Sequence, residues 1–279
     1  MPWPSLRQVE QDLIICRALC DLFNAPALAG KLAFRGGTAM NKLLFQQPLR
    51  YSEDIDLVQT TPEPIGATVD AIREALSWLG TCTREQAEHS MHLVFTFVAE
   101  ADPQVKPKVK VEINTREHIA VQDYKMYAFE VDNSWYKAKT EIASYEPEEL
   151  FGTKLRALLQ RHKNRDLFDL NEGLKQLSMN SDKLVACFEH YLALGGTSIS
   201  RAMAEERMLK KLTRSLTEDI APLLPTGITF TEDEAIIAFG KVWFELIGRI
   251  KGEPWKLTEK VIEQLRQKKY PDLLKGESI

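Results

Sequence analysis

The segment of this chain best suited to chemistry is YSEDIDL, residues 51–57. In a β-strand, residues two apart project from the same face, so Asp54 and Asp56 are expected to point together while Ile55 and Leu57 face the core. Paired carboxylates are hard oxygen ligands that suit Mg²⁺ or Mn²⁺. The segment therefore predicts a divalent metal site on the polar face of a short strand.

A second strand, predicted over residues 107–114, alternates cleanly and places Glu112 on its polar face. If the two strands are neighbours in one sheet, Glu112 joins Asp54 and Asp56 around one or two metal ions, which suits in-line phosphoryl or nucleotidyl transfer. The alternative for Glu112 is an ordinary solvated strand acid. Either Asp56 or Glu112 would help to deprotonate an acceptor hydroxyl, and the sequence leaves that choice open.

The glycine pair in RGGTAMNKL, residues 35–43, predicts a phosphate site. Gly36 and Gly37 would let a phosphate approach the backbone, and the helix that follows presents unpaired N–H groups to an anion. Thr38 is expected to be the N-cap of this helix and, with Ser52, to add a hydroxyl to the site. Lys42 is interpreted as a surface residue of the helix. The segment is not a P-loop, because the Gly-Lys-Ser/Thr sequence is absent.

A basic cluster occupies the segment ELFGTKLRALLQRHKNRDLFDL, residues 149–170. On one continuous helix, Lys154, Arg161 and Arg165 would fall near a single stripe, with Asp166 and Asp169 following at helical spacing. Lys154 is then positioned to contact the outer phosphates of a nucleotide, and one aspartate to orient or bind a substrate. The alternative is an exposed helix face whose charge is balanced by acids elsewhere.

The remaining pattern predicts an α/β half followed by a helical half. Helices are predicted over 5–25 and 66–79, and strands over 31–35, 54–58, 91–98, 107–114, 125–132 and 137–143. From Pro147 onward nearly all segments have helical periodicity: 147–162, 165–178, 181–194, 199–215, 231–250 and 256–268. We place the boundary near residue 145, with one domain over 1–145 and another over 146–279.

Composition sets limits on the function. The chain has 279 residues and a formal net charge of −4, so any nucleic-acid contact must come from a local patch. Cys16 and Cys20 lie four apart in an apolar helical run and are interpreted as core residues. No segment has the pattern of a secretory signal or the length of a bilayer span, so we expect a cytosolic protein with reduced thiols and no membrane partner.

Taken in order, these motifs resemble the AbiEii-type nucleotidyltransferase toxins of the DNA polymerase β-like nucleotidyltransferase superfamily. That family has a Gly-Gly/Ser turn, a D-x-D strand, a Lys-Leu-x-Ala helix and an Arg-Asp-x-x-Asp segment, and all four occur here within residues 34–170. The resemblance implies an α+β fold: a polymerase β-like core with a mixed sheet (1–145), followed by an all-helical domain (146–279) that completes the active-site cleft. It also implies the toxin half of a type IV toxin–antitoxin or abortive-infection system.

The resemblance also implies roles for individual residues. Asp54 and Asp56 would bind Mg²⁺, and Lys154 and Arg165 would contact the nucleotide. Of the two aspartates in the last motif, Asp169 is the first choice for a catalytic role and Asp166 the second. The triphosphate would be held by the residues of the turn and its neighbour, Gly36, Gly37, Thr38 and Ser52.

The expected reaction is transfer of NMP from an NTP to an acceptor, in some members of the family the 3′ end of tRNA, which blocks translation and growth. The expected partner is a cognate antitoxin. Two alternatives remain open: a catalytically idle NTP- or RNA-binding protein, and a nucleotidyltransferase acting on a protein or small-molecule acceptor. Neither the NTP nor the acceptor is evident from the sequence.

Overall fold

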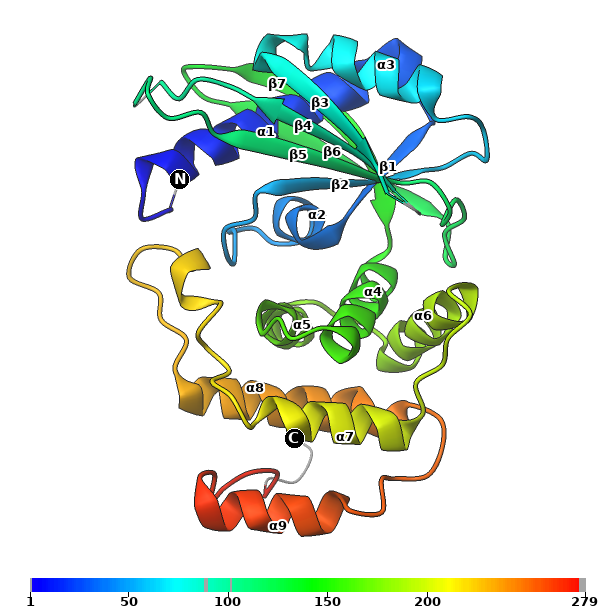
Figure 1. Cartoon of the computed structure of the whole chain (residues 1–279), viewed down its shortest axis with the longest axis vertical. Coiled ribbons are helices and arrows are strands. Elements are labelled where there is room, and N and C mark those ends of the chain that lie inside the picture. The colour runs from blue at the N-terminus through cyan, green and yellow to red at the C-terminus, as the bar shows by residue number, and fades with distance from the viewer. Residues whose placement is uncertain (1, 88–89, 101, 276–279) are drawn as a thin grey trace. The chain divides into compact units, whose positions relative to one another are not determined.

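The structure is a computed structural model that describes residues 2–87, 90–100 and 102–275. The chain divides into two compact units, Met1–Glu146 and Pro147–Ile279, which are called the sheet unit and the helical unit. Figure 1 shows that the first contains the sheet and the second only helices and loops. The α+β class expected from the sequence is confirmed.

The sheet unit is built on one mixed sheet of seven strands in the order β3-β4-β5-β2-β1-β7-β6. The central pairs are β1 with β2, which is antiparallel, and β2 with β5, which is parallel. The strands span Leu32–Arg35 (β1), Asp54–Gln59 (β2), Thr81–Gln86 (β3), Ser90–Thr96 (β4), Lys108–Asn114 (β5), Tyr124–Asp132 (β6) and Lys137–Tyr145 (β7).

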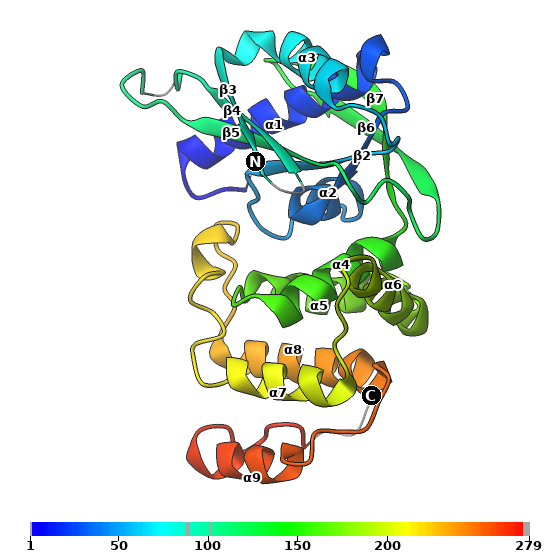
Figure 2. The same ribbon diagram turned by 45° about the vertical axis from the view of Figure 1, so that its right-hand side comes forward.

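Alternation along the central strands separates an apolar face from a polar face. Ile55 and Leu57 of β2 are buried in the main core cluster, and the residues on either side of Ile55 point the other way. The core cluster also contains side chains of α1 (Leu6–Asn24) and α3 (Gly66–Ala75), such as Leu19 and Ile72. Figures 1 and 2 show α1 and α3 over one face of the sheet and α2 (Gly36–Leu43) on the other. The polar face of β2 is therefore the α2 face.

Local signals explain where the first helix begins. Ser5 is the N-cap of α1, and its side chain and that of Gln8 form a reciprocal capping box. The buried face of α1 carries Ile15, Leu19 and both Cys16 and Cys20, so the core role expected for these cysteines is confirmed.

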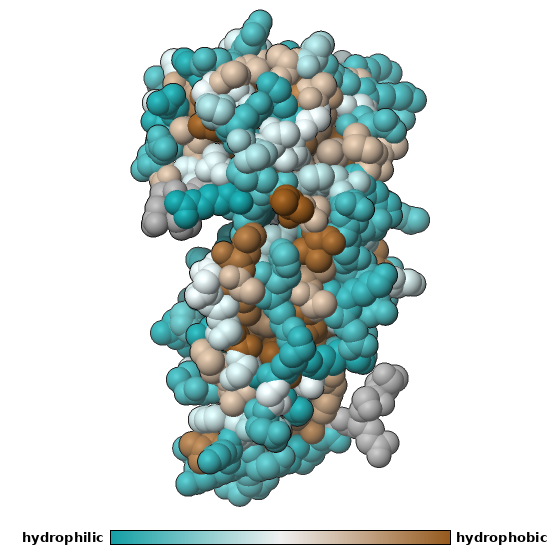
Figure 3. Space-filling model, turned by 90° about the vertical axis from the view of Figure 1, so that its right-hand side faces the viewer, coloured by the Kyte–Doolittle hydropathy of each residue, from teal (hydrophilic) through white to brown (hydrophobic). Residues whose placement is uncertain are grey.

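The helical unit contains α4 (Pro147–Gln160), α5 (Arg165–Gln176), α6 (Ser181–Leu194), α7 (Arg201–Lys211), α8 (Glu232–Glu245) and α9 (Thr258–Lys268). Its core is formed where α4 packs against α5 and α6, and where α5 packs against α8. Large side chains such as Phe151, Phe188 and Phe239 are fully buried there. Figure 3 shows that apolar side chains also reach the surface of this unit, among hydrophilic ones.

Two features differ from the expected elements. Strand β3 was not predicted, because its sequence TCTREQ is polar and mostly exposed on both faces, as an edge strand can be. The gap between α4 and α5 at residues 161–164 agrees with the helices predicted over 147–162 and 165–178, but it interrupts the single stripe that was expected for Lys154, Arg161 and Arg165. Within the part of the chain that the structure describes, none of the helices has the length and apolar character needed to traverse a bilayer.

Candidate active site

Three carboxylates project from the polar face of adjacent strands. In the parallel pair β2–β5, Asp56 lies opposite Glu112 and Asp54 opposite Lys110. In the antiparallel pair β1–β2, Arg35 lies opposite Asp56. The two strands are therefore neighbours, which was the condition for Glu112 to join the aspartates, and Asp56 and Glu112 share a register row.

The Asp56 carboxyl group is harder to ionise than that of an ordinary aspartate. Its pKa is raised to about 6, first by burial and then by the negative charges of Asp54 and Glu112. Arg35 and Lys110 act in the opposite direction without overcoming the increase. An ionised Asp56 would thus be stabilised by a cation close to it.

Glu112 is already paired in the structure. Its Oε2 lies 2.9 Å from Lys110 Nζ and 3.5 Å from His92 Nε2. Among the described residues, no group of three or more acidic, histidine or cysteine side chains stands ready to hold a metal ion. The predicted set of three carboxylates is therefore not assembled, because Glu112 turns to its basic neighbours.

The donor set still suits a divalent cation at Asp54 and Asp56. Both are hard oxygen ligands on one face of one strand, and burial, followed by the charges of Asp54 and Glu112, raises the pKa of Asp56. A bound cation would offset both effects, so the pair is the best candidate for metal binding.

The glycine bend lies directly against the acidic strand. Gly36 begins α2 with a φ of +79°, a conformation that favours glycine, and a Cβ there would overlap the Asp56 carboxylate. A Cβ at Gly37 would lie 2.6 Å from Arg50 Nη2 and 3.5 Å from Ser52 Oγ. The predicted proximity of the bend to the aspartates is thus observed. The space above the glycines is filled by the protein's own side chains, whereas an open approach for a phosphate had been predicted.

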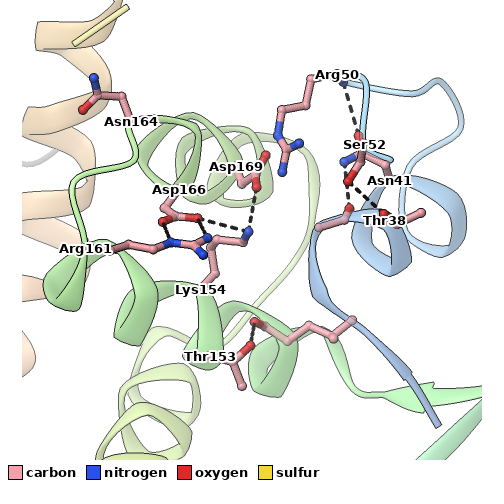
Figure 4. A network of polar contacts seen from close by, with 12 residues as sticks. Thr38, Asn41, Arg50, Ser52, Thr153, Lys154, Arg161, Asn164, Asp166 and Asp169 are labelled. Atoms are coloured by element: carbon pink, nitrogen blue, oxygen red, sulfur yellow. Dashed lines mark hydrogen bonds and ion pairs between the residues drawn. The ribbon is translucent and has the colours of Figure 1, made fainter. Parts of the chain in front are cut away.

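The hydroxyls beside the bend form a short hydrogen-bonded chain. Thr38 Oγ1 donates to the Asp54 carbonyl at 2.5 Å and lies 2.8 Å from Ser52 Oγ, as Figure 4 shows for the two side chains. Because the single Thr38 proton is used on that carbonyl, Ser52 must be the donor to Thr38. The predicted N-cap role of Thr38 is wrong: Arg35 is the N-cap, and Thr38 lies buried in the first turn. A phosphate contact by either hydroxyl would have to replace these bonds.

The structure also corrects the interpretation of Lys42. It was interpreted as a surface residue, but its ammonium lies 2.5 Å from Asp12 Oδ1 and 3.2 Å from Cys16 Sγ, with the side chain largely buried. The long aliphatic part of lysine allows such burial when a carboxylate meets the charge. Lys42 therefore ties α2 to α1.

In the helical unit, the predicted basic stripe is replaced by a compact ion-pair cluster, defined by Lys154, Arg161, Asp166 and Asp169. The Lys154 ammonium lies 3.2 Å from Asp166 Oδ1 and 3.0 Å from Asp169 Oδ2, with the lysine side chain only 7% exposed. Arg161 donates two hydrogen bonds to Asp166, at 2.7 and 2.8 Å. Figure 4 shows the ammonium between the two carboxylates.

This cluster explains the break between α4 and α5. Asp166, in the first turn of α5, holds Arg161 just beyond the end of α4. The Asn164 N–H is capped by Asp219, at 3.0 and 3.2 Å. Asp166 is fully buried and pairs with two cations, which gives it a structural role that the sequence interpretation did not include.

Arg165 is half-buried, and no carboxylate of the described residues lies within ion-pair distance of it.

The sequence interpretation also missed one buried cation of the sheet unit. Arg50 is 2% exposed, its guanidinium lies beside Gly37, and Nη1 donates to the Tyr51 carbonyl at 3.0 Å. Asn41 Oδ1 accepts from the backbone N–H groups of Leu49 and Arg50 and fixes this loop (Figure 4). The signal was present in the sequence as an arginine four residues before Asp54, but no periodic pattern marked it as buried.

The comparisons with known proteins agree with this geometry. Residues 17–242 match the family described as nucleotidyl transferase AbiEii toxin, type IV TA system. No protein of curated function matched the sequence.

Two solved structures share the fold at low identity. The nucleotidyltransferase toxin MenT4 from Mycobacterium tuberculosis superposes with a TM-score of 0.61 at 16% identity, over 96% of this chain and 92% of that one. JHP933 from Helicobacter pylori gives 0.58 at 17%, over 94% and 97%. The family match covers well over half of the chain, and it includes both the acidic strand and the ion-pair cluster. The chain belongs to the AbiEii nucleotidyltransferase toxin family of type IV toxin–antitoxin systems.

Proposed function

We propose that this toxin uses Mg²⁺ or Mn²⁺ to transfer NMP from an NTP to the 3′ end of tRNA, and that this modification stops translation. The observation that carries the proposal is the contact between the Asp56 carboxylate and Gly36 at the start of α2. It puts a candidate metal ligand beside a candidate phosphate site. Such a pairing suits nucleotidyl transfer, because a metal held there would supply positive charge to the reacting phosphates.

In this proposal, Asp54 and Asp56 hold the metal, and the first N–H groups of α2 hold the triphosphate. The bound metal would neutralise charge on the leaving pyrophosphate. Gly36 and Gly37 keep Asp56 and Arg50 close to the helix start, and Arg50 contributes a fixed positive charge next to it. Asp56 lies beside the start of α2, whereas Glu112 is paired with Lys110, so Asp56 is also the better candidate to accept a proton from an acceptor hydroxyl.

Residues of the helical unit are part of the proposal as well. Asp166 is fully buried and paired with Lys154 and Arg161, which gives it a structural role, so Asp169, whose Oδ2 lies 3.0 Å from Lys154 Nζ, stays the first choice for a role in the reaction. Lys154 is held by both carboxylates and would contact a phosphate only by giving up one of them. Arg165, with no ion pair to the described residues, is the more accessible phosphate ligand.

Support for a tRNA acceptor comes from the toxin family. A nucleotidyltransferase that arrests growth must modify something essential, and the 3′ end of tRNA offers a hydroxyl nucleophile. This acceptor would place the toxin in the cytosol, with a cognate antitoxin as its partner. The identity of the NTP is left to experiment.

The test is incubation of the purified protein with each labelled NTP, Mg²⁺ and total tRNA, for the wild type and for Asp54→Ala. Label on RNA that disappears in Asp54→Ala supports the proposal. Label on protein or on a small molecule would redirect it to another acceptor, and absence of label with every NTP would favour an idle binding protein. Sequencing RNA 3′ ends after brief expression then identifies the acceptor and the added base together.

A further inference from the structure

A basic pocket lies in the helical unit, apart from the residues assigned above to metal and nucleotide binding. It has a volume of about 540 Å³ and lies among the end of α4, the loop before α7 and the last turns of α7. Its lining contains the hydroxyls of Thr197 and Ser198 and no carboxylate. The basic side chains that line it are Arg161, His162, Arg207, Lys210 and Lys211.

Two of these cations are neutralised by carboxylates behind the lining. Arg161 is held by Asp166, and Lys210 Nζ lies 2.7 Å from Glu206 Oε1. Lys210 remains 66% exposed, so this surface pair is weak and leaves the ammonium available to an anion.

Two further cations, Arg207 and Lys211, donate to carbonyl groups. Arg207 Nη1 donates to the Leu159 carbonyl at 3.1 Å, and Lys211 Nζ to the Arg161 carbonyl at 2.8 Å. Among the described residues, no carboxylate lies within ion-pair distance of either. Burial lowers the pKa of Lys211, although Asp166 and Asp219 act against this. Both side chains stabilise the carbonyl end of α4, and neither forms an ion pair with a carboxylate of the described residues.

The lining favours phosphate over a protein surface as the occupant. Protein interfaces gather aromatic anchors around an apolar centre. The pocket is lined instead by cations and hydroxyls, and of the residues that the structure describes, its lining includes the aliphatic side chains of Leu159 and Ile199 and no Phe, Tyr or Trp. A smaller pocket of about 220 Å³ shares His162 and Lys211 with the first and adds Arg214, but Glu218 and Asp219 also line it, so the lining without carboxylates is confined to the first pocket. Several cations around one pocket suit the phosphate groups of a nucleic-acid strand.

We propose that this basic pocket binds the phosphodiester backbone of the RNA acceptor, through contacts that do not depend on base sequence. The inference rests on the proposed function, since it assumes an RNA acceptor. Arg207 and Lys210 are the main contacts, because their side chains face the pocket from α7 and Lys210 is exposed. The pocket would make no contact that distinguishes one base from another.

The test compares two variants that each remove two positive charges from the helical unit. Arg207→Gln with Lys210→Gln alters the pocket, and glutamine can still donate to the Leu159 carbonyl. Lys183→Gln with Lys251→Gln is the matched control, since both lysines are exposed and neither lines the pocket. Lys210→Gln alone is the safeguard against misfolding, and circular dichroism melts check all three.

Binding of a labelled RNA hairpin with a single-stranded 3′ tail is measured by fluorescence anisotropy over about 50 to 300 mM salt. The pocket variant should lose about 10-fold or more in affinity, and the slope of log K against log salt should decrease by about 1 to 2. The control variant should keep the wild-type slope. NTP binding, followed by calorimetry, should be unchanged in both.

Equal losses in the two double variants, or an unchanged slope in the pocket variant, would overturn the inference. So would saturable binding of inorganic phosphate or polyglutamate that depends on Arg207 and Lys210, since the pocket would then serve a small anion or an acidic protein. If the wild type binds RNA with this dependence but transfers no NMP to it, the proposed function fails while the pocket assignment stands.

Discussion

Replacing Asp56 by Asn should stabilise the metal-free protein at neutral pH. In the folded chain the pKa of Asp56 is raised to about 6, by burial and by the charges of Asp54 and Glu112. The ordinary value for aspartate is about 3.9. Above pH 6 the folded protein therefore carries an ionised group that is more costly than in the unfolded chain, and asparagine removes that cost.

The magnitude follows from linkage. A rise of about two in pKa corresponds to about 3 kcal/mol of lost stability at about pH 7.5. Asp56 is only half-buried by accessible area, and solvent screening reduces this figure, so we expect about 1 to 3 kcal/mol. Since 1 kcal/mol moves the melting temperature of a domain of this size by about 2 to 4 °C, the gain should be several degrees.

The sign of the pH dependence is specific. Between the ordinary and the raised pKa the folded state binds the extra proton, so wild-type stability falls as pH rises through this window. The advantage of Asp56→Asn should be largest at about pH 7.5, about half as large near pH 5, and close to zero near pH 4. Added Mg²⁺ should stabilise the wild type more than the variant, because the ion pairs with the carboxylate.

The assay is differential scanning calorimetry in EDTA and in Mg²⁺ across this pH range. Asp70→Asn is the matched control: it removes one carboxylate from the same unit at a side chain that is 77% exposed, and should change stability by less than about 0.5 kcal/mol. A variant no more stable than the wild type at neutral pH, or a gain that does not change with pH, would refute the reasoning.

Three further predictions follow from the contacts. Gly37→Ala places a Cβ 2.6 Å from Arg50 Nη2, so it should lower NMP transfer by about 10-fold or more in the labelled-NTP assay, while Arg50→Lys should be similarly impaired. Lys154→Ala leaves Asp166 and Asp169 buried without their shared cation, so it should destabilise the helical unit by about 3 to 5 kcal/mol in urea unfolding. Burial opposes ionisation of Asp166, but Lys154 and its arginine partner lower its pKa overall, so its contribution to stability should be complete above about pH 4 and be lost as pH falls further, as acid titration by circular dichroism would show.

Each of these three predictions would be contradicted by a specific result. Full transfer activity in Gly37→Ala would mean that the guanidinium position is unimportant. A Lys154→Ala protein with wild-type stability would mean that the ion-pair cluster does not hold the helices together. For Asp166, loss of helical structure centred near pH 6 would point to a different titrating group.

Periodic features of the fold could be predicted from sequence, and features set by distant contacts could not. The alternation of β2 and β5 identified both the strands and the face that carries Asp54 and Asp56, because burial on one side enforces a period of two. Strand β3 has no such burial, and its pairing with β4 is evident only in the folded sheet.

The same distinction applies to the site residues. The composition of the sequence identified the glycine bend, but not why a glycine is needed there. A Cβ at Gly36 would overlap the Asp56 carboxylate. Lys42 and Lys154 were each interpreted as helix-surface or phosphate-facing residues, and each proved to be buried against carboxylates. A lysine gives no local sign of such a partner when that partner lies on another helix.

The most direct measurement of the central claim is anomalous diffraction from crystals of the protein grown with Mn²⁺ and a non-hydrolysable NTP. We expect a manganese peak between the Asp54 and Asp56 carboxylates, with the phosphates at the start of α2. Manganese and nucleotide bound elsewhere, with these aspartates unliganded, would contradict it.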